Sequence, residues 1–123
     1  MSDYLRLRTL IEISEHSDYH LASQGEMEYA ATPDEWEGPA KVDALTTGTT
    51  VELGNYTSVT VALVENTDPT NFVVVTHTYA AASAAVRVPP GAFIAIYSPT
   101  VANDLLLTAD TATCTCKVWI AGT

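Results

Sequence analysis

The chain is short of several kinds of residue, and each shortage excludes a class of protein. Only 5 of its 123 residues are Lys or Arg, against 15 Asp or Glu, so the formal net charge is −10 at pH 7. Proteins that bind DNA, RNA or anionic lipid usually present clusters of basic side chains. We therefore predict no direct contact with nucleic acid or with a membrane surface. The negative charge instead favours solubility, or docking on a basic protein surface.

Long apolar runs are missing as well. A membrane-spanning helix needs about 20 predominantly apolar residues in a row, and no run in this chain approaches that length. The N-terminal residues, Met-Ser-Asp-Tyr-Leu-Arg-Leu-Arg, contain neither the apolar region nor the cleavage site of a secretory signal peptide. The sequence therefore predicts neither a signal peptide nor a membrane-spanning helix.

Cysteine occurs only as Cys114 and Cys116, in a strand-like stretch. Residues at i and i+2 of a strand point to the same side, but their Cβ atoms lie too far apart for a disulfide. We predict two buried free thiols, in agreement with a reducing compartment. His77 could serve as a base for a thiol nucleophile, but a thiol in a core stays protonated and unreactive. We predict no catalytic residue and no enzymatic activity.

Candidate sites for metals and cofactors are equally weak. The segment 15–20 contains two histidines and two carboxylates, but the spacing matches no metal-binding motif, and a polar turn explains it. Asn66 and Asp68 could offer oxygen atoms to calcium, which takes 6–8 such ligands, whereas a turn bonded to its own backbone needs no ion. Glycines occur singly at turns, so there is no phosphate-binding loop. We predict neither a metal nor a cofactor.

The chain does contain many Thr, Val and Ala residues in short alternating stretches, which favour strands over helices. The central stretch is Thr57–Ile96. It reads as two strands around a turn at 66–71, an alanine-rich bend, the short run Val86–Val88 and a Pro-Gly turn that leads into another strand. The other expected strands are Tyr4–Ser14, Tyr19–Ala22, Glu26–Ala30, Lys41–Thr46, Thr50–Leu53, Leu105–Thr108 and Thr111–Ile120.

Three of these segments carry further detail. The alternation in the first strand changes phase near Leu10, which predicts either a β-bulge or a strand that crosses between sheets. The segment Thr47–Thr49 reads as a hairpin turn between two short strands. The last strand alternates regularly, with Cys114, Cys116, Val118 and Ile120 predicted to face inward and Thr113, Thr115, Lys117 and Trp119 outward.

Residues 15–40 are the least regular part and hold much of the acidity, so we predict an acidic loop or arm there. Thr32–Trp36 could begin a single helical turn, because Thr caps helices and Pro suits their first position, and Gly38-Pro39 would end it. Short strands separated by turn signals predict an all-β fold. We expect one domain over residues 1–123, an antiparallel β-sandwich or jelly-roll-like barrel of about eight or nine strands.

A protein of this kind acts through its surface. Trp, Tyr and Arg are favoured as interface anchors, and the candidate interface residues are Trp36, Trp119, Lys117, Tyr19, Arg6 and Arg8. Each Trp could instead cover an edge of the sheet or one end of the core. Few lysines are available to protect edge strands, so contact with a partner along an edge is also expected.

The run Asn66–Val74, the segment Val88–Phe93 and the segment Leu107–Asp110 before a closing apolar strand resemble small β-sandwich structural proteins of tailed-phage virions. The likeness covers about the C-terminal half. It implies a non-enzymatic virion protein, either a capsid decoration (cement) protein or a head–tail associated subunit. Such a protein would be made in the host cytoplasm, form a homo-oligomer and bind the major capsid protein or another virion subunit.

An alternative reading is a carbohydrate- or receptor-binding module of a phage tail or fibre. In that case Trp36, Tyr19 and Trp119 would stack on sugar rings.

Overall fold

The computed structural model describes residues 5–15, 18–29 and 35–123, with side chains described from residue 39 onward. In these residues it contains ten strands and no helix. The described residues therefore include no helix that could span a membrane. The chain divides into two compact units, Met1–Pro33 and Asp34–Thr123, where the sequence led us to expect one domain over residues 1–123.

The first unit is a two-stranded antiparallel hairpin of β1 (Leu5–Glu15) and β2 (Asp18–Tyr29). Its register shifts between Ile11 and Glu12, which confirms the predicted bulge near Leu10. The continuous β2 replaces the two short strands expected at Tyr19–Ala22 and Glu26–Ala30. The reason is that the polar residues between them pair with β1 like their neighbours, and hydrogen bonding across the hairpin outweighs weak local propensity.

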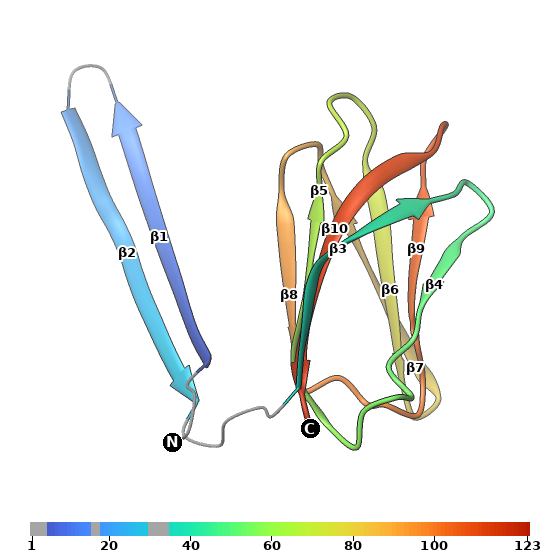
Figure 1. The fold of residues 1–123 in the computed structure, drawn as a ribbon. Helices are drawn as coiled ribbons and strands as arrows, with labels where there is room; N and C mark the ends of the chain where they lie inside the picture. Colours follow the sequence, from blue (N-terminus) through green and yellow to red (C-terminus); the bar gives the residue numbers. More distant parts are fainter. Residues whose placement is uncertain (1–4, 16–17, 30–34) are drawn as a thin grey trace. The chain divides into compact units, whose positions relative to one another are not determined.

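The second unit contains eight strands. They are β3 (Glu35–Ala44), β4 (Thr49–Val51), β5 (Val59–Asn66), β6 (Val73–Tyr79), β7 (Ala82–Val88), β8 (Phe93–Tyr97), β9 (Leu105–Ala109) and β10 (Cys114–Gly122). They form two four-stranded antiparallel sheets, ordered β3-β10-β5-β8 and β4-β9-β6-β7 (Figure 1). This is the strand order of a jelly roll. The predicted antiparallel β-sandwich is confirmed, and the sheets do not close into a barrel.

The core of this unit lies between the two sheets. Its largest fully buried apolar side chains come from both sheets and from the segment after β4: Leu53, Val64, Val73, Val75, Leu105 and Leu107. Cys114, Cys116, Val118 and Ile120 are buried as predicted, while Lys117 is exposed and Trp119 is partly buried on the opposite face of β10. The alternation of apolar and polar residues thus correctly predicted which face of β10 is buried.

The segment 15–40 is more regular than predicted. Strand β2 and part of β3 occupy most of it, and Glu35, Trp36, Gly38 and Pro39 lie in β3 instead of in a helical turn; residues 30–34 lie outside the described residues. Pairing of β3 with β10 outweighs the local helix-start signals, because it satisfies a whole row of backbone groups. Pro39 is compatible with β3 because β3 is an edge strand and its register shifts there.

The segment Thr47–Thr49 is not a hairpin turn. The backbone N–H of Gly48 donates to the carbonyl of Leu45 at 3.0 Å, so a tight turn does form, and Gly48 supplies its positive φ of 99°. However, β3 pairs with β10 in one sheet and β4 pairs with β9 in the other. The turn therefore carries the chain from one sheet to the other, a choice that turn residues alone do not encode.

Candidate interaction surface

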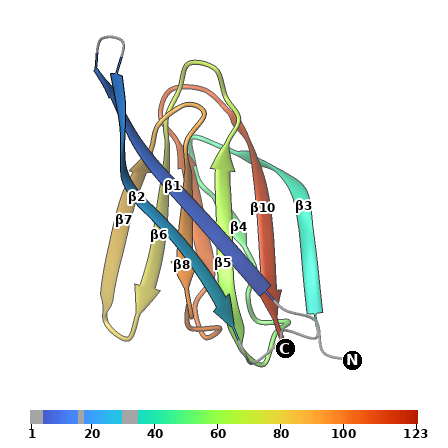
Figure 2. The same ribbon diagram turned by 90° about the vertical axis from the view of Figure 1, so that its left-hand side faces the viewer.

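The sandwich has two open sides, each bordered by one edge strand of each sheet. Strands β3 and β4 border one, which we call the β3–β4 side, and β7 and β8 border the other, the β7–β8 side (Figure 2). An edge strand presents unpaired backbone N–H and C=O groups that can pair with another chain. The two sides can therefore be compared as potential interaction surfaces.

The β3–β4 side carries features that discourage pairing. Strand β3 contains Pro39, which has no N–H to donate, together with the exposed charged residues Lys41 and Asp43. Strand β4 is only three residues long. Proline, charge and short length are the usual protections of edge strands.

Strand β7 has fewer of these protections, with Arg87 as its one charged residue. It has seven residues, contains neither proline nor an acidic residue, and pairs with β6 alone. Residues Ala82–Arg87 are all exposed. The sequence had indicated an alanine-rich bend here, with a strand only at Val86–Val88. That prediction is wrong for Ala82–Ala85, which continue the ladder with β6 up to the Tyr79–Ala82 pair.

Several exposed apolar side chains also lie on or next to β7 and β8. Of the six large hydrophobic residues that are exposed in the described part of the chain, four lie on or next to β7 and β8: Tyr79 (70% exposed), Val86 (44%), Phe93 (60%) and Tyr97 (45%). Val86 shares a face of β7 with Val88, but Val88 is buried and Val86 is 44% exposed. Phe93 and Tyr97 lie on the face of β8 opposite the core-facing Ile94 and Ile96, and Val86 lies on the core-facing side of its own sheet. Exposed apolar residues are thus present on both edge strands of this side, and such surface is a candidate for interaction where it is contiguous.

One buried polar residue holds this side in place. Asn66, at the end of β5, is fully buried. Its side-chain amide donates to the carbonyl of Val88 at 3.1 Å, and its backbone carbonyl accepts from the N–H of Gly91 at 2.8 Å. Its own N–H donates to the carbonyl of Ala92 at 2.9 Å. The end of β7 and the start of β8 are thus fastened to the centre of the sandwich.

The loop after Asn66 is built from side chains that bond to backbone, as predicted. The Asn66 side-chain oxygen accepts from the N–H of Asp68 at 3.0 Å. An Asp68 carboxylate oxygen accepts from the N–H of Asn71 at 2.6 Å and from that of Thr70 at 3.0 Å. These bonds stabilise the charged carboxylate and hold the pKa of Asp68 below its usual value of 3.8. The Asp68 carboxylate thus accepts hydrogen bonds from the backbone of its own turn.

The two ends of β7 are fixed by different contacts. Near its C-terminal end the Arg87 guanidinium lies 4.0 Å from the centre of the Phe72 ring, a cation–π contact. At its N-terminal end the chain reverses through Ala80, whose φ of 54° is unusual for a residue with a Cβ atom. The hydroxyl groups of Thr78 and Ser83 hydrogen-bond across the hairpin at 2.7 Å.

The two thiols have the properties of core groups. Cys114 Sγ donates to the carbonyl of Ala112 at 3.5 Å. Burial raises the pKa of Cys116 to about 11, and burial followed by the charges of Asp68 and Asp110 raises that of Cys114. Both are free cysteines, as predicted. A thiol with a raised pKa stays protonated at neutral pH and is a poor nucleophile.

His77 lies on β6 opposite Ala84. Its Nε2 is buried and has no hydrogen-bond partner among the described residues. The described part of the chain shows no hydrogen bond between His77 and either thiol, so it does not display the nucleophile–base pair that thiol catalysis requires.

None of the predicted interface residues lies on β7 or β8. Lys117 nevertheless shares one face of its sheet with Phe93, because both lie opposite Glu65. Lys117 and Trp119 are on β10, where Lys117 is opposite Glu65 and Trp119 opposite Leu63 of β5. Trp36 is opposite Ala121. In the other unit, Arg6 pairs in register with Glu28, Arg8 with Glu26, and Tyr19 with Ser14. The side chains of Trp36, Tyr19, Arg6 and Arg8 lie outside the described residues.

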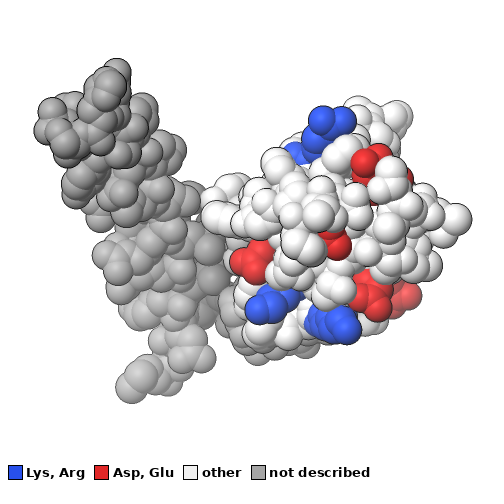
Figure 3. Space-filling view, turned by 90° about the horizontal axis from the view of Figure 1, so that it is seen from above, with Lys and Arg blue, Asp and Glu red and all other residues white. Residues whose placement is uncertain are grey.

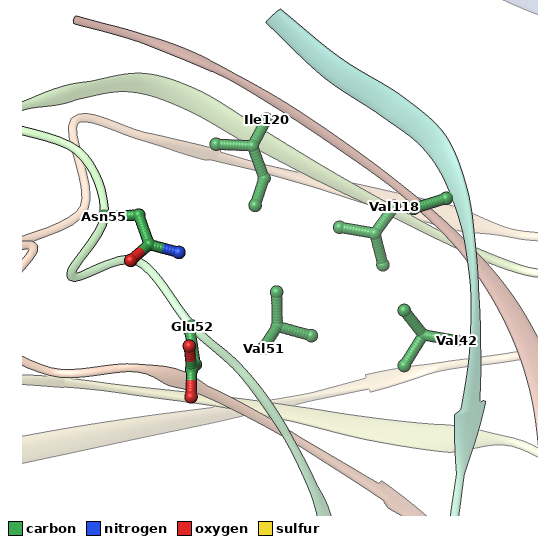
Figure 4. Close-up of a pocket in the computed structure, with 7 residues that line it drawn as sticks. Val42, Val51, Glu52, Asn55, Val118 and Ile120 are labelled. Atoms are coloured by element: carbon green, nitrogen blue, oxygen red, sulfur yellow. The ribbon is translucent and has the colours of Figure 1, made fainter.

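A pocket of about 260 Å³ opens between the two sheets on the β3–β4 side (Figure 4). Val42, Val51, Val118 and Ile120 point into it, and Glu52 and Asn55 supply its polar groups. Ligand pockets are usually somewhat larger and hold several converging polar groups. Among its lining residues there is no nucleophile with a neighbouring base.

Charge is distributed unevenly along the chain. Nine of the fifteen acidic residues lie within residues 1–38, which leaves six acidic and three basic residues in residues 39–123. Figure 3 shows the basic and acidic groups of the sandwich interspersed on a mostly uncharged surface. The sandwich itself therefore repels a second copy less than the net charge of −10 suggests.

A scan against protein-family models found no matching family. Searches among curated proteins and among solved structures found no similar protein. The argument for the β7–β8 side as an interaction surface therefore comes from the structure of this chain.

Proposed function

We propose that this protein is a non-enzymatic structural protein of a virion, a capsid decoration (cement) protein that binds the major capsid protein or another virion subunit. The observation that supports the proposal is the open β7–β8 side, whose edge strand β7 has no proline and whose strands carry exposed apolar side chains, with Val86 44% and Phe93 60% exposed. The resemblance of the turns at 66–71 and 88–93 to those of tailed-phage structural proteins supports the virion as its location.

Binding by this surface has a direct physical basis. Complete burial of a side chain such as Val or Phe is worth about 1.5–3 kcal/mol, so a few of them can anchor a complex. The Asn66 bonds hold the ends of β7 and β8 in the free protein. A surface that is already ordered loses little conformational entropy when a partner binds.

The test is electron microscopy and mass spectrometry of purified particles made with and without this protein. We expect the protein on the particles, and we expect a variant carrying Val86→Ser and Phe93→Ser to be lost from them. The matched control is Leu106→Ser, since Leu106 is also exposed (40%) but lies on β9. Absence of the unmodified protein from particles would contradict the proposal.

A second candidate function is a carbohydrate- or receptor-binding module of a phage tail or fibre. The exposed rings of Tyr79, Phe93 and Tyr97 favour it, because all three supply flat apolar surface and the two Tyr rings also carry a hydroxyl group. A glycan array followed by fluorescence titration tests it. Binding that is lost in Phe93→Ser and Tyr97→Ser but retained in Leu106→Ser would support it, and no response to any glycan would count against it.

A further inference from the structure

We propose that β7 pairs with β7 of a second copy of the chain, antiparallel and across a two-fold axis at Ala85. The two four-stranded sheets that contain β7 would then join into one continuous sheet. This inference goes beyond the proposed function. It names an interface between identical copies and does not require a virion, so either idea can fail without the other.

The backbone of β7 is suited to this pairing. In the second unit β7 ends the order β4-β9-β6-β7, so one side of the strand pairs with β6 and the other has no strand next to it in that sheet. The N–H and C=O groups on that side can be satisfied fully by another strand. The seven residues contain no proline, so no donor of the strand is missing.

The side chains of β7 complement their own copy. With Ala85 opposite Ala85 of the partner, each large residue lies opposite a small one: Val86 opposite Ala84, Val88 opposite Ala82, and Arg87 opposite Ser83. Opposite residues in an antiparallel pair have Cβ atoms about 4.5–5.5 Å apart, so a small residue makes room for a large one. No pair places like charges together, since Arg87 is the only charged residue of the strand.

The pairing also covers exposed apolar surface. Val86 and Val88 face the same side of the sheet as Val73 and Val75 of β6, but Val86 is 44% exposed. In the proposed dimer Val86 of each copy lies beside Ala84 of the other, so each copy covers part of the exposed apolar surface of its partner. Burial of this apolar area adds to the backbone hydrogen bonds.

Electrostatics favour β7 over the other edges. Two copies with a net charge of −10 each repel one another. Strand β7 contains no acidic residue, whereas β3 contains Glu35, Glu37 and Asp43. Strands β8 and β4 have only five and three residues. An edge pairing buries little area, so we expect a dissociation constant of about 1–100 μM.

The first experiment is sedimentation velocity of the purified full-length chain. The series covers about 1–500 μM, which spans the affinities of small interfaces. We expect a monomer–dimer equilibrium for the unmodified chain. Ala85→Lys should weaken it at least about tenfold, because two lysines then oppose each other at the two-fold axis. The control is Thr50→Lys, the same charge on an exposed residue of β4 at the other edge of the same sheet; it should leave the equilibrium unchanged.

The second experiment tests the register. Ser83→Glu should tighten the dimer about fivefold, because each copy gains a Glu–Arg87 pair, and Ser83→Lys should weaken it by a similar factor. Combining Ser83→Lys with Arg87→Glu should restore the affinity. Circular dichroism of each variant shows whether the monomer is still folded, and the Ser83 variants test the interface even if Ala85→Lys does not fold.

The outcomes separate the possibilities. Dimers that respond to Ala85 and Ser83 as described support the proposal. A chain that stays monomeric over the whole range overturns it, as does a dimer that is insensitive to Ala85→Lys in a folded variant. A chain that is monomeric alone but loses binding to virion particles when Ala85 is changed assigns β7 to a different partner and also overturns the self-pairing.

Discussion

Two sides of one sandwich end in very different edge strands. The β3–β4 side presents Pro39, Lys41 and a strand of only three residues, β4. The β7–β8 side presents a seven-residue strand with one charged residue, Arg87, together with most of the large apolar side chains that are exposed in the described chain. Both sides border the same core, so the features that oppose pairing at an edge depend on the residues of that edge strand and not on the core. The β7–β8 side therefore presents the longer edge with fewer features that oppose pairing.

Removal of the anchor of the β7–β8 side should have the largest effect. Asn66→Ala deletes the amide that bonds to the carbonyls of Val88 and Asn71 and leaves both groups without that donor. Each unsatisfied buried group costs about 1–3 kcal/mol, so we expect a loss of about 3 kcal/mol. Urea unfolding monitored by circular dichroism measures it. Thr70→Ala is the control, because it removes only a 3.3 Å hydrogen bond at an exposed position. Equal stabilities for the two variants would contradict the role of Asn66.

Ionisation of the Cys116 thiol in the core should destabilise the whole sandwich. The folded-state pKa of Cys116 is about 11, above its usual 9.0. The unfolded chain therefore releases this proton first, and stability should fall as the pH rises from about 9 to about 11. Urea unfolding of the wild type and of Cys116→Ala along this pH range checks it. The stability difference between the two should shrink as the pH rises, and a constant difference would show that the thiol is not responsible.

The β3–β4 side should self-associate when proline and charge are removed from β3. Pro39→Val with Lys41→Val gives β3 two β-branched residues and a restored N–H donor. We expect self-association about tenfold tighter than wild type, with species larger than dimers, because each added cross-strand pair is worth up to about 1 kcal/mol. Light scattering against concentration measures this. Thr46→Val, an exposed position in the turn after β3, should change nothing. An unchanged oligomer size in the double variant would mean that other features protect β3.

The hairpin that leads into β7 should accept a glycine. Ala80 has a φ of 54°, a conformation that favours glycine. Ala80→Gly should raise the free energy of unfolding by about 0.5–1 kcal/mol. Ala81→Gly is the matched control, because Ala81 has no positive φ and glycine there only adds freedom to the unfolded chain. Thermal and urea unfolding should place the two variants on opposite sides of the wild type.

The smallest effect is expected at acidic pH in the loop that follows Asn66. The pKa of Asp68 is lowered in the folded state from 3.8 by the N–H groups of Asn71 and Thr70. Its contribution to stability is therefore complete above pH 3.8 and disappears as the pH falls through the lower folded-state value. Asp68→Asn should be less stable than wild type at neutral pH, and the difference should vanish in acid. A difference that persists at low pH would assign the effect to lost packing.

Much of the fold was predictable because its signals are local. The alternation of Cys114, Cys116, Val118 and Ile120 predicts the buried face of β10, and Asn66 and Asp68 predict a turn bonded to its own backbone. The change of phase near Leu10 predicts the bulge in β1. Each of these features depends on residues a few positions apart, which a reading of the sequence can compare directly.

The interaction surface was not predictable in the same way. Ala82–Ala85 have no apolar–polar alternation and low strand propensity, so they read as a bend, and only pairing with Thr76–Tyr79 makes them a strand. The available signal was an eight-residue run from Ala80 to Arg87 without proline or acid. The candidate anchors Trp36 and Trp119 were chosen by residue type. Trp119 is partly buried, and the large apolar side chains that are exposed in the described part of the chain include Tyr79, Phe93, Tyr97 and Val86.

Amino-acid type and spacing alone determined that the chain forms strands, which face of β10 is buried, and that the thiols remain unpaired. The tertiary structure decided which strands become edges, because that depends on how β3 and β4 are divided between two sheets and on the hydrogen bonds of Asn66 to residues more than twenty positions away. The preference for a strand or a turn depends on residues a few positions apart. Whether a strand becomes an edge depends on which other strands pair with it, and these come from distant parts of the sequence.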